Sequence, residues 1–440
     1  MDYKDWLAYK DLRYMNNVLY FNNINTNNVT NEYKTPIYII NERMIRNRYK
    51  TLKKNLDCIY RNNDIHYAVK ANTNIAVLKI LISEGANFDC TSLGEIYTCL
   101  KLGVKPSQII YTGNMFTNED LRCAVENDII INLDSISQVF RLAKIYDELD
   151  KEKNIISFRI NPELGAGHHS HTITAGRNVK FGILEEQVVL AYKTAIQLGF
   201  KQFGIHTHIG SGILNMSDYE KPMEKYLEIV KMLSKTLDIT FEFVDFGGGF
   251  GIPYRPNEDP INLEHYNKVV IEKFKILIEE GKLGDPKLFI EPGRYISAES
   301  SLLLVQINTI KDNGYKLFAG INAGFNILIR PTLYGSYHHI IPCNYNDKED
   351  HLNYDIAGPI CESGDILGKD RRLPKLSEED FLAIMDVGAY GFSMSSNYNS
   401  RPRPAEILIG NNNIFMVREA EQYEDLLLYQ KLPEYLKKDV

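Results

Sequence analysis

Short apolar runs rich in β-branched and aromatic residues alternate with longer segments of helical periodicity along most of the chain. Candidate strands occupy residues 36–40, 65–69, 87–91, 108–113, 129–135, 155–161, 202–210, 241–249 and 287–293. Helical patterns lie between them, for example at 74–86, 118–128, 184–199 and 219–237. Strands and helices that alternate at intervals of roughly 20 to 40 residues are typical of βα units around a parallel sheet.

The number of these units favours a closed barrel over an open sheet. About eight of them precede residue 300, which predicts an α/β fold with a (β/α)₈ barrel over 36–300. Several strands end in polar or glycine-rich segments, and a barrel places its active site at those carboxyl ends. After residue 300 strand-like pieces follow with few long helical runs. We therefore predict a mainly β domain made of 301–440 together with 1–35, the N-terminal segment packing on the C-terminal part.

Composition narrows the possible locations and partners. The chain has 440 residues, 44% hydrophobic and 24% charged, and its net charge of −7 does not favour binding to nucleic acid or an anionic membrane. It contains no apolar run near the roughly 18 to 20 residues that span a bilayer, and its first residues lack an apolar signal core. The six cysteines form no CxxC pair. These features predict a cytoplasmic protein with no disulfide framework.

Lys70 stands at the end of an apolar strand, in "DIHYAVKANTN" (64–74). A lone lysine in such a place usually extends its amine to water. Burial at the mouth of a barrel would instead disfavour the charged amine and suit the residue to Schiff-base chemistry with a carbonyl. The neighbouring motifs decide between these two interpretations.

Three other strand ends carry residues that could bind further parts of a carbonyl compound held by Lys70. "DFGGGFG" (245–251) has three consecutive glycines whose N–H groups can cradle a phosphate. "EPGR" (291–294) places Glu291 where it can keep a heterocyclic nitrogen protonated, and Arg294 is an anion binder. "HTHIGS" (206–211) offers His208 to stack on a flat ring, although His206 and His208 could also form a metal-binding pair.

The segment "HHSH" (168–171) looks like a metal cluster by composition. It has no Asp, Glu or Cys at ligand spacing, so we expect an active-site loop and no bound metal. A lysine, a phosphate cradle, an acid for a ring nitrogen and a stacking histidine together indicate pyridoxal 5′-phosphate (PLP) as the cofactor.

The motifs also match a known family. "YAVKAN", "GIHTHIGSG", "DFGGGFG", "EPGR", "IRPTLYGSYH", "GPICESGDILGKDRRLP" and "GAYGFSMSSNYNSRPRPAE" occur in order between residues 35 and 408. With these motifs the chain resembles the fold-type III PLP-dependent decarboxylases. The resemblance implies an alanine-racemase-like barrel followed by a β domain, and a head-to-tail homodimer with shared active sites.

The resemblance also implies a role for each matching residue. Lys70 binds the cofactor aldehyde, His208 stacks on the pyridine ring and Glu291 pairs with the ring nitrogen. The phosphate is held by Ser211, Gly247, Gly248 and Gly249, with the turn that contains Gly293 and Arg294, and Tyr390 lies near it. Arg294, Arg330, Tyr334 and Tyr390 contact the substrate. Cys361, as the proton donor, and Glu362, as a substrate ligand, reach the active site of the partner subunit.

The charges of this set predict the substrate. Arg294 and Arg330 each fit a carboxylate, and Glu362 fits an ammonium group. Such a site matches meso-2,6-diaminopimelate, whose decarboxylation gives L-lysine and CO₂ in lysine biosynthesis. Asn322 and Ile327, in "NAGFNI", stand where acids are expected in the family and bear on the substrate preference.

Three alternatives remain open at this stage. The first is a decarboxylase of D-lysine, D-ornithine or a carrier-bound amino acid, which would not need the carboxylate pocket of Arg294 and Arg330. The second is a racemase of the same fold, against which Glu291 argues, since an arginine faces the ring nitrogen there. The third is a non-catalytic relative that binds partners, although Lys70, His208, Glu291 and Cys361 are all present.

Overall fold

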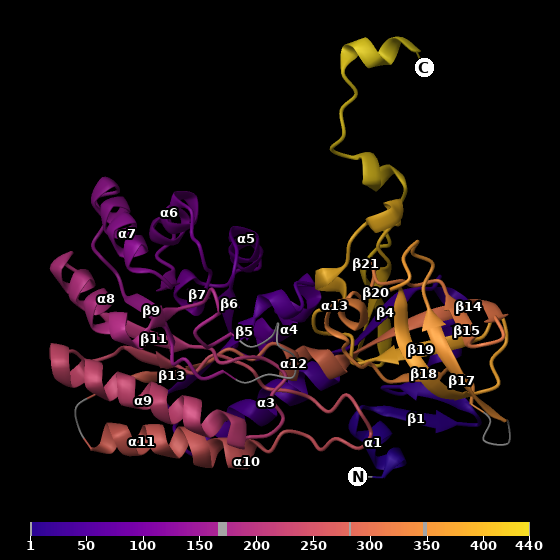
Figure 1. Cartoon of the computed structure of the whole chain (residues 1–440), viewed down its shortest axis with the longest axis horizontal. Coiled ribbons are helices and arrows are strands. Elements are labelled where there is room, and N and C mark those ends of the chain that lie inside the picture. The colour runs from indigo at the N-terminus through magenta and orange to yellow at the C-terminus, as the bar shows by residue number, and fades with distance from the viewer. Residues whose placement is uncertain (1, 166–173, 281–282, 346–349, 440) are drawn as a thin grey trace. The chain divides into compact units, whose positions relative to one another are not determined.

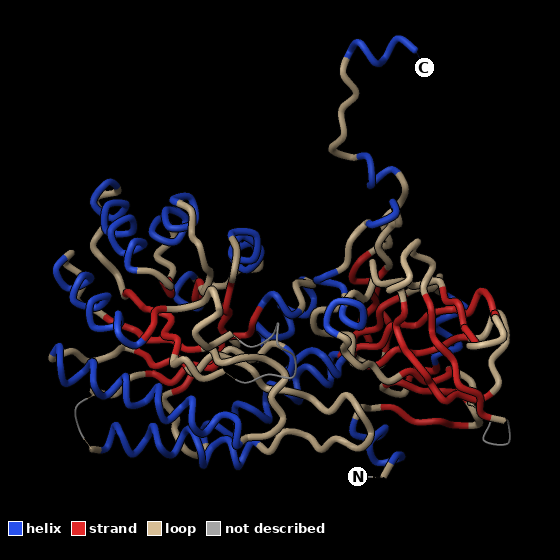
Figure 2. Tube along the Cα trace, in the orientation of Figure 1, coloured by secondary structure: helices blue, strands red, loops and turns tan. Residues whose placement is uncertain are grey.

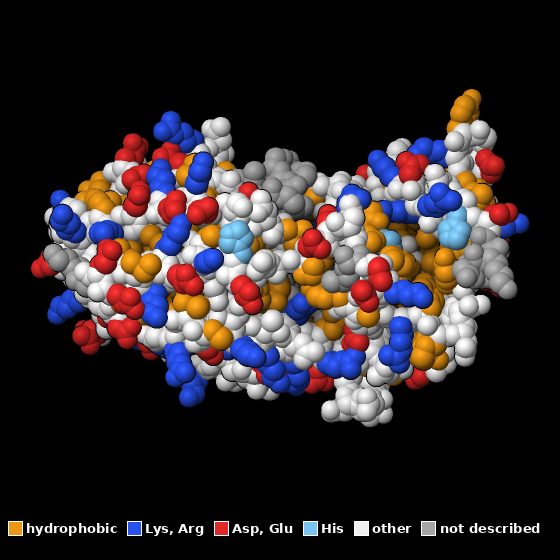
Figure 3. Space-filling view, turned by 90° about the horizontal axis from the view of Figure 1, so that it is seen from below, with side chains coloured by type: hydrophobic (Ala, Val, Ile, Leu, Met, Phe, Trp, Pro, Cys, Tyr) orange, Lys and Arg blue, Asp and Glu red, His pale blue; other side chains and the backbone are white. Residues whose placement is uncertain are grey.

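The computed structural model describes residues 2–165, 174–280, 283–345 and 350–439 (Figure 1). The backbone forms two compact units. The first is built on Glu42–Ser300 and the second on Lys4–Asn41 with Ser301–Val440. In the part of the chain that is described, no helix is both long enough and apolar enough to cross a membrane. Lysines, arginines and acids are intermingled over the face drawn in Figure 3.

The first unit is a closed parallel barrel. Its strands are β5 (Asn63–Ala68), β6 (Asn87–Cys90), β7 (Ile109–Tyr111), β8 (Ile130–Leu133), β9 (Ile156–Asn161), β11 (Phe203–Thr207), β12 (Phe243–Asp245) and β13 (Lys287–Ile290). Each pairs with the next in this order and β13 pairs with β5, which closes the ring. A two-residue strand, β10 (Ile183–Leu184), adds to β9. The predicted (β/α)₈ barrel is confirmed.

Helices surround these strands (Figure 2). They are α3 (Glu42–Asp57), α4 (Ile75–Ser83), α5 (Leu93–Lys101), α6 (Asn118–Glu126), α7 (Ile136–Glu148), α8 (Glu185–Gln197), α9 (Ser217–Leu237), α10 (Leu263–Tyr266), α11 (Glu272–Glu279) and α12 (Arg294–Ser297). Side-chain caps begin several of them. Ser92 accepts from the Glu95 amide, and Thr117 and Asp120 form a reciprocal capping box. Because the strands are covered on both faces, their residues are buried almost without alternation.

The second unit is a mostly antiparallel sheet in the order β18-β17-β15-β14-β4-β20-β21. Its strands are β4 (Ile37–Asn41), β14 (Ser301–Asp312), β15 (Leu317–Ile321), β16 (Ile340–Pro342), β17 (His351–Ala357), β18 (Ile366–Pro374), β19 (Phe381–Met385), β20 (Ala405–Gly410) and β21 (Asn413–Arg418). The N-terminal part adds α1 (Tyr3–Tyr9), a small sheet of β1 (Leu12–Met15), β2 (Val18–Phe21) and β3 (Ile24–Asn25), and α2 (Thr26–Glu32). One helix, α13 (Arg330–Tyr334), follows β15.

One strand assignment was wrong. The run at 36–40, predicted as the first barrel strand, forms β4, which pairs with β14 and β20 in the second unit. All five residues of β4 are buried. A fully buried strand has the same apolar pattern in a barrel and in the centre of an antiparallel sheet, so the pattern does not identify its partners.

Candidate active site

Lys70 lies in a single 3₁₀ turn, Val69–Ala71, directly after β5. Its Nζ is 2.8 Å from Oδ2 of Asp89, at the end of the adjacent strand β6. The Lys70 side chain is 40% exposed, whereas that of Asp89 is fully buried. Burial and the nearby charge of Glu291 raise the pKa of Asp89 to about 7, although Lys70 opposes this rise. The lysine is therefore held at the barrel mouth by a carboxylate that binds protons near neutral pH.

Glu291 follows β13 and is buried among polar groups. Its Oε2 is 3.0 Å from Nε2 of His206, and its Oε1 accepts a hydrogen bond of 3.1 Å from the Thr112 hydroxyl. Burial disfavours the charged form, but the electrostatic attraction and hydrogen bond of His206, with the charge of Lys70, keep the pKa of Glu291 below its ordinary value. The site thus holds a permanent buried anion, suited to a positively charged ring nitrogen.

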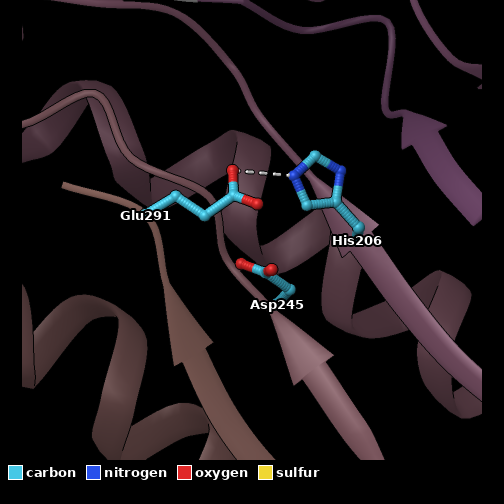
Figure 4. A group of neighbouring side chains, drawn as sticks. All are labelled: His206, Asp245 and Glu291. Atoms are coloured by element: carbon cyan, nitrogen blue, oxygen red, sulfur yellow. Dashed lines mark hydrogen bonds and ion pairs between the residues drawn. The ribbon is translucent and has the colours of Figure 1, made fainter. Parts of the chain in front are cut away.

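His206, Asp245 and Glu291 converge from three strand ends (Figure 4). Burial lowers the pKa of His206, while the charge and the hydrogen bond of Glu291 oppose that shift. Burial and the charge of Glu291 raise the pKa of Asp245 well above its ordinary value. One ligand atom from each of the three lies within 4.8 Å of the others, so the group could also accept a cation. The absence of a metal stays a prediction.

His208 follows β11 and is held by the glycine loop. Its Nδ1 accepts a 3.0 Å hydrogen bond from the Gly248 amide. Burial and the positive charges of Arg159 and Lys70 keep the pKa of His208 well below its ordinary value. The result is a neutral, oriented imidazole ring, which is the form suited to stacking on another flat ring.

The loop Gly247–Gly249 requires glycine at each position. A Cβ on Gly247 would lie 2.3 Å from the Thr207 carbonyl oxygen, and one on Gly248 would lie 2.2 Å from the Glu291 carbonyl oxygen. Gly247 and Gly249 have φ values of +64° and +104°. The Gly247 amide donates to Oδ1 of Asp245 at 2.8 Å and the Gly248 amide donates to His208, so the loop is a tight turn whose lack of side chains leaves room for an anion such as a phosphate.

Arg294 and Ser211 meet at the edge of this loop region. The Arg294 guanidinium donates to the Ser211 Oγ at 3.1 Å and to the Tyr254 hydroxyl at 2.7 Å. Gly293 immediately precedes Arg294 and begins the short helix α12. The structure thus brings together, in the barrel unit, seven predicted residues besides Lys70 and His208: Ser211, Gly247, Gly248, Gly249, Glu291, Gly293 and Arg294.

The remaining predicted residues belong to the second unit. Arg330 is 1% exposed, and its guanidinium donates to Nε2 of His338 at 3.0 Å. His338 in turn donates from Nδ1 to the Met385 carbonyl oxygen at 2.8 Å. Arg330 begins the short helix α13, and Tyr334, which is half-buried, ends it. Tyr390 has a positive φ of 59°.

Cys361 and Glu362 lie on an exposed loop of the second unit. The base of this loop is anchored by Asp365, whose carboxylate accepts the Phe325 amide at 2.6 Å and the Ile360 amide at 2.7 Å. Asn322 and Ile327, which depart from the family pattern, contact other residues of the second unit. Asn322 bonds the Thr35 hydroxyl, and Ile327 is buried in the apolar core of this unit. The histidine cluster at 168–171 lies outside the described residues.

Sequence reasoning missed several polar residues of the barrel interior. Asp89 and Thr112 stand at strand ends in "NFDCT" and "YTGN", which was an available signal. Arg159 is buried in β9, with its guanidinium 4.6 Å from the Phe181 ring. Burial lowers the pKa of Arg159, and four acids oppose this. The polar strand end "RINP" (159–162) was a local signal, but only barrel closure turns Arg159 toward those acids.

The fold and the positions of Lys70, Glu291, His208 and the glycine loop fit a PLP-dependent barrel enzyme. Residues 42–298 match the family model described as "Pyridoxal-dependent decarboxylase, pyridoxal binding domain". The chain belongs to this family of pyridoxal-dependent decarboxylases.

Individual relatives are similar over nearly the full length. The chain is 46% identical to a diaminopimelate decarboxylase of Methanothermobacter thermautotrophicus, covering 93% of this chain and 95% of the relative. It is 37% identical to one of Archaeoglobus fulgidus, covering 95% and 98%. Among solved structures, the diaminopimelate decarboxylase of Methanocaldococcus jannaschii superposes with a TM-score of 0.89 at 31% identity, covering 98% and 100%. The Helicobacter pylori enzyme complexed with L-lysine gives 0.84 at 33%, covering 92% and 98%.

Proposed function

We propose that this enzyme decarboxylates meso-2,6-diaminopimelate to L-lysine and CO₂. The observation that carries the proposal is the full-length similarity to relatives named diaminopimelate decarboxylase, one of them in complex with L-lysine. The barrel site supports it, because it offers a lysine, a buried anion, a neutral stacking ring and a side-chain-free cradle within one unit.

The residues of the barrel fit PLP. Lys70 would hold the aldehyde carbon, Glu291 the ring nitrogen, His208 the ring face, and the Gly247–Gly249 loop with Ser211 the phosphate. When bound, PLP supplies an electron sink for the pair left behind by the departing carboxylate. Glu291 makes this sink effective, since a buried carboxylate favours the protonated ring nitrogen. The hydrogen bonds of His206 and Thr112 support the charged form of Glu291.

The second unit would supply recognition and the final proton. Arg330 is a fork-shaped carboxylate binder whose orientation His338 supports, and with Arg294 it fits the distal carboxylate of the substrate. Glu362 would accept the distal ammonium. After the bond from the α carbon to the carboxylate breaks and CO₂ leaves, the Cys361 thiol gives its proton to that carbon, and water later returns a proton to the sulfur.

A homodimer with shared active sites and a cytoplasmic location are parts of the same proposal. The exposure of Cys361 and Glu362 supports the dimer, because residues that reach the site of a second subunit must lie on the surface of their own. Sedimentation of the purified enzyme would measure the assembly. A monomer that is fully active would contradict the shared site.

The substrate is tested by CO₂ release from meso-diaminopimelate, L-lysine, D-lysine, D-ornithine and L-ornithine, with lysine detected as the product. We expect activity on meso-diaminopimelate and little on the others. Only the distal end of this substrate, away from the carboxylate that is lost, carries both a carboxylate and an ammonium group. Activity restricted to lysine or ornithine would contradict the substrate. A protein that stays colourless and inactive with added PLP would contradict the enzymatic function altogether.

A further inference from the structure

A short turn in the second unit, residues 397–400, contacts both residues of the exposed loop that carries the proposed proton donor. Hydrogen bonds between Asn397 and residues that follow the turn hold it in place. The side-chain amide of Asn397 donates to the Arg401 carbonyl oxygen at 3.1 Å and to the Glu421 carboxylate at 2.5 Å. Glu421 also accepts a hydrogen bond of 2.6 Å from the Arg403 guanidinium. Its middle residues, Tyr398 and Asn399, therefore have a defined position relative to the loop.

Asn399 contacts Cys361 through both ends of its side-chain amide. Its Oδ1 accepts the Cys361 backbone N–H at 3.3 Å, and its Nδ2 donates to the Cys361 Sγ at 3.2 Å. The first contact fixes the backbone of the cysteine and the second fixes its χ1 rotamer. Because the amide occupies a lone pair of the sulfur, the S–H proton must point away from Asn399.

The backbone of Asn399 is in an unfavourable region for most residues. Its φ and ψ are 58° and 26°, in the left-handed region that asparagine tolerates better than most other non-glycine residues. This conformation aims the amide at the neighbouring loop. Glycine would fit the same backbone but would offer no amide.

Tyr398 contacts Glu362 as Asn399 contacts Cys361, through its side chain. Its hydroxyl donates to Oε1 of Glu362 at 2.7 Å, and its ring stacks on Phe325 with centroids 5.7 Å apart and planes 19° from parallel. The hydrogen bond and the charge of Glu362, with a smaller contribution from Cys361, raise the pKa of Tyr398 to about 12, so the hydroxyl remains a donor over the physiological pH range. One carboxylate oxygen of Glu362 is thereby occupied, and the other stays available for an ammonium group.

We propose that Asn399 and Tyr398 are positioning residues: Asn399 orients the thiol of Cys361, and Tyr398 orients the carboxylate of Glu362. The inference rests on the proposed function, in which Cys361 donates the proton and Glu362 binds the substrate ammonium. It adds that two neighbouring residues of one turn hold the proton donor and the substrate ligand, Asn399 acting chiefly on protonation and Tyr398 chiefly on the affinity for substrate.

The first test separates kcat from KM in the purified, PLP-loaded enzyme with meso-diaminopimelate. Asn399→Asp keeps the size, the left-handed preference and the acceptor, but removes the donor to sulfur. We expect kcat to fall by about tenfold or more, as for a misplaced proton donor, with KM within about twofold. Asn399→Gly, which suits the backbone and lacks both contacts, should lower kcat as well. Wild-type kcat in either variant would overturn the role of Asn399.

Tyr398→Phe removes only the hydroxyl that holds Glu362. We expect KM to rise by roughly three- to tenfold, the loss of one hydrogen bond to a charged group, with kcat nearly unchanged. An unchanged KM would overturn the role of Tyr398. Matched controls are Asn412→Asp, at an exposed left-handed asparagine with φ 60°, and Tyr315→Phe, at a tyrosine that is 96% exposed. Both should behave like the wild type.

A second readout follows the thiol directly. The rate of iodoacetamide alkylation at Cys361, measured by peptide mass in the PLP-loaded enzyme, should fall in Asn399→Asp, because a carboxylate beside the sulfur disfavours the reactive thiolate. Alkylation of the exposed Cys58 should not change and serves as an internal control. An unaltered rate at Cys361 would show that the amide does not act on the sulfur.

Failure of this inference is distinguishable from failure of the proposed function. If Cys361→Ala retains wild-type kcat, the proton-donor assignment itself is wrong. If Cys361→Ala is strongly impaired while Asn399→Asp is not, only the positioning role is wrong.

Discussion

The barrel unit and the second unit hold their functional residues in different ways. In the barrel, Asp89, His206, Asp245 and Glu291 are buried, and their charges depend on one another. In the second unit, Cys361 and Glu362 lie on an exposed loop, and each is contacted by one side chain of a neighbouring turn. If the proposed function is correct, cofactor binding depends on a buried network of coupled charges, whereas recognition and protonation depend on contacts that can be changed one at a time.

The largest expected effect is that of removing Lys70. In Lys70→Ala the bond to the cofactor aldehyde is impossible, so we expect activity to fall by at least about a thousandfold and the near-visible absorbance band of the PLP-loaded enzyme to be lost. Absorbance spectra and CO₂ release measure both effects. Lys79→Ala, at an exposed lysine on α4, is the control and should keep the band.

If Lys70→Ala kept both the band and the activity, the barrel unit would not be the cofactor-binding half. The comparison between the two units would then have no functional basis.

A smaller effect is expected from filling the glycine cradle. The added Cβ in Gly248→Ala would lie 2.2 Å from the Glu291 carbonyl oxygen, so the loop must move and PLP affinity should fall by about tenfold or more. Spectroscopic titration of the cofactor-free protein measures the affinity. Gly94→Ala, whose nearest contact is 3.8 Å away, should not change it. An unchanged affinity in Gly248→Ala would mean that the phosphate is held elsewhere.

A third expected effect concerns the dependence of stability on pH. The pKa of Asp89 is about 7 in the folded chain, above its unfolded value, so the folded state binds this proton more tightly. Between the two pKa values the unfolded state has lost the proton and the folded state keeps it. Stability of the cofactor-free protein should therefore fall as pH rises from about 5 to 7, by at most about 1.4 kcal/mol per pH unit from this group.

Asp89→Asn should remove that component and flatten the profile, which denaturant unfolding at a series of pH values would measure. A profile of unchanged slope would mean that Asp89 is not strongly perturbed. The barrel network would then be less coupled than its burial indicates.

Sequence reasoning was most successful where chemistry and local pattern coincide. The βα alternation, Lys70 after an apolar strand, the three glycines and Glu291 are local features, and their spacing along the chain already indicates their place at strand ends. It failed for the run at 36–40 and for Arg159, because a buried strand carries no mark of its neighbours. The two histidines of "HTHIGS" show the same limit: the sequence left open that they form a metal-binding pair, and the structure gives them different partners, Glu291 for His206 and the Gly248 amide for His208.

The sequence by itself therefore determined the barrel, the cofactor chemistry and the family. These follow from residue types and periodicities that act over a few neighbouring positions. Only the tertiary structure decided that β4 joins the second sheet, that Asp89 pairs with Lys70, that His206 supports Glu291, and that Asn399 faces Cys361. Each of these is a choice of partner between residues from 19 to about 260 positions apart. Such choices are made by burial and packing of the whole chain, which no local pattern records.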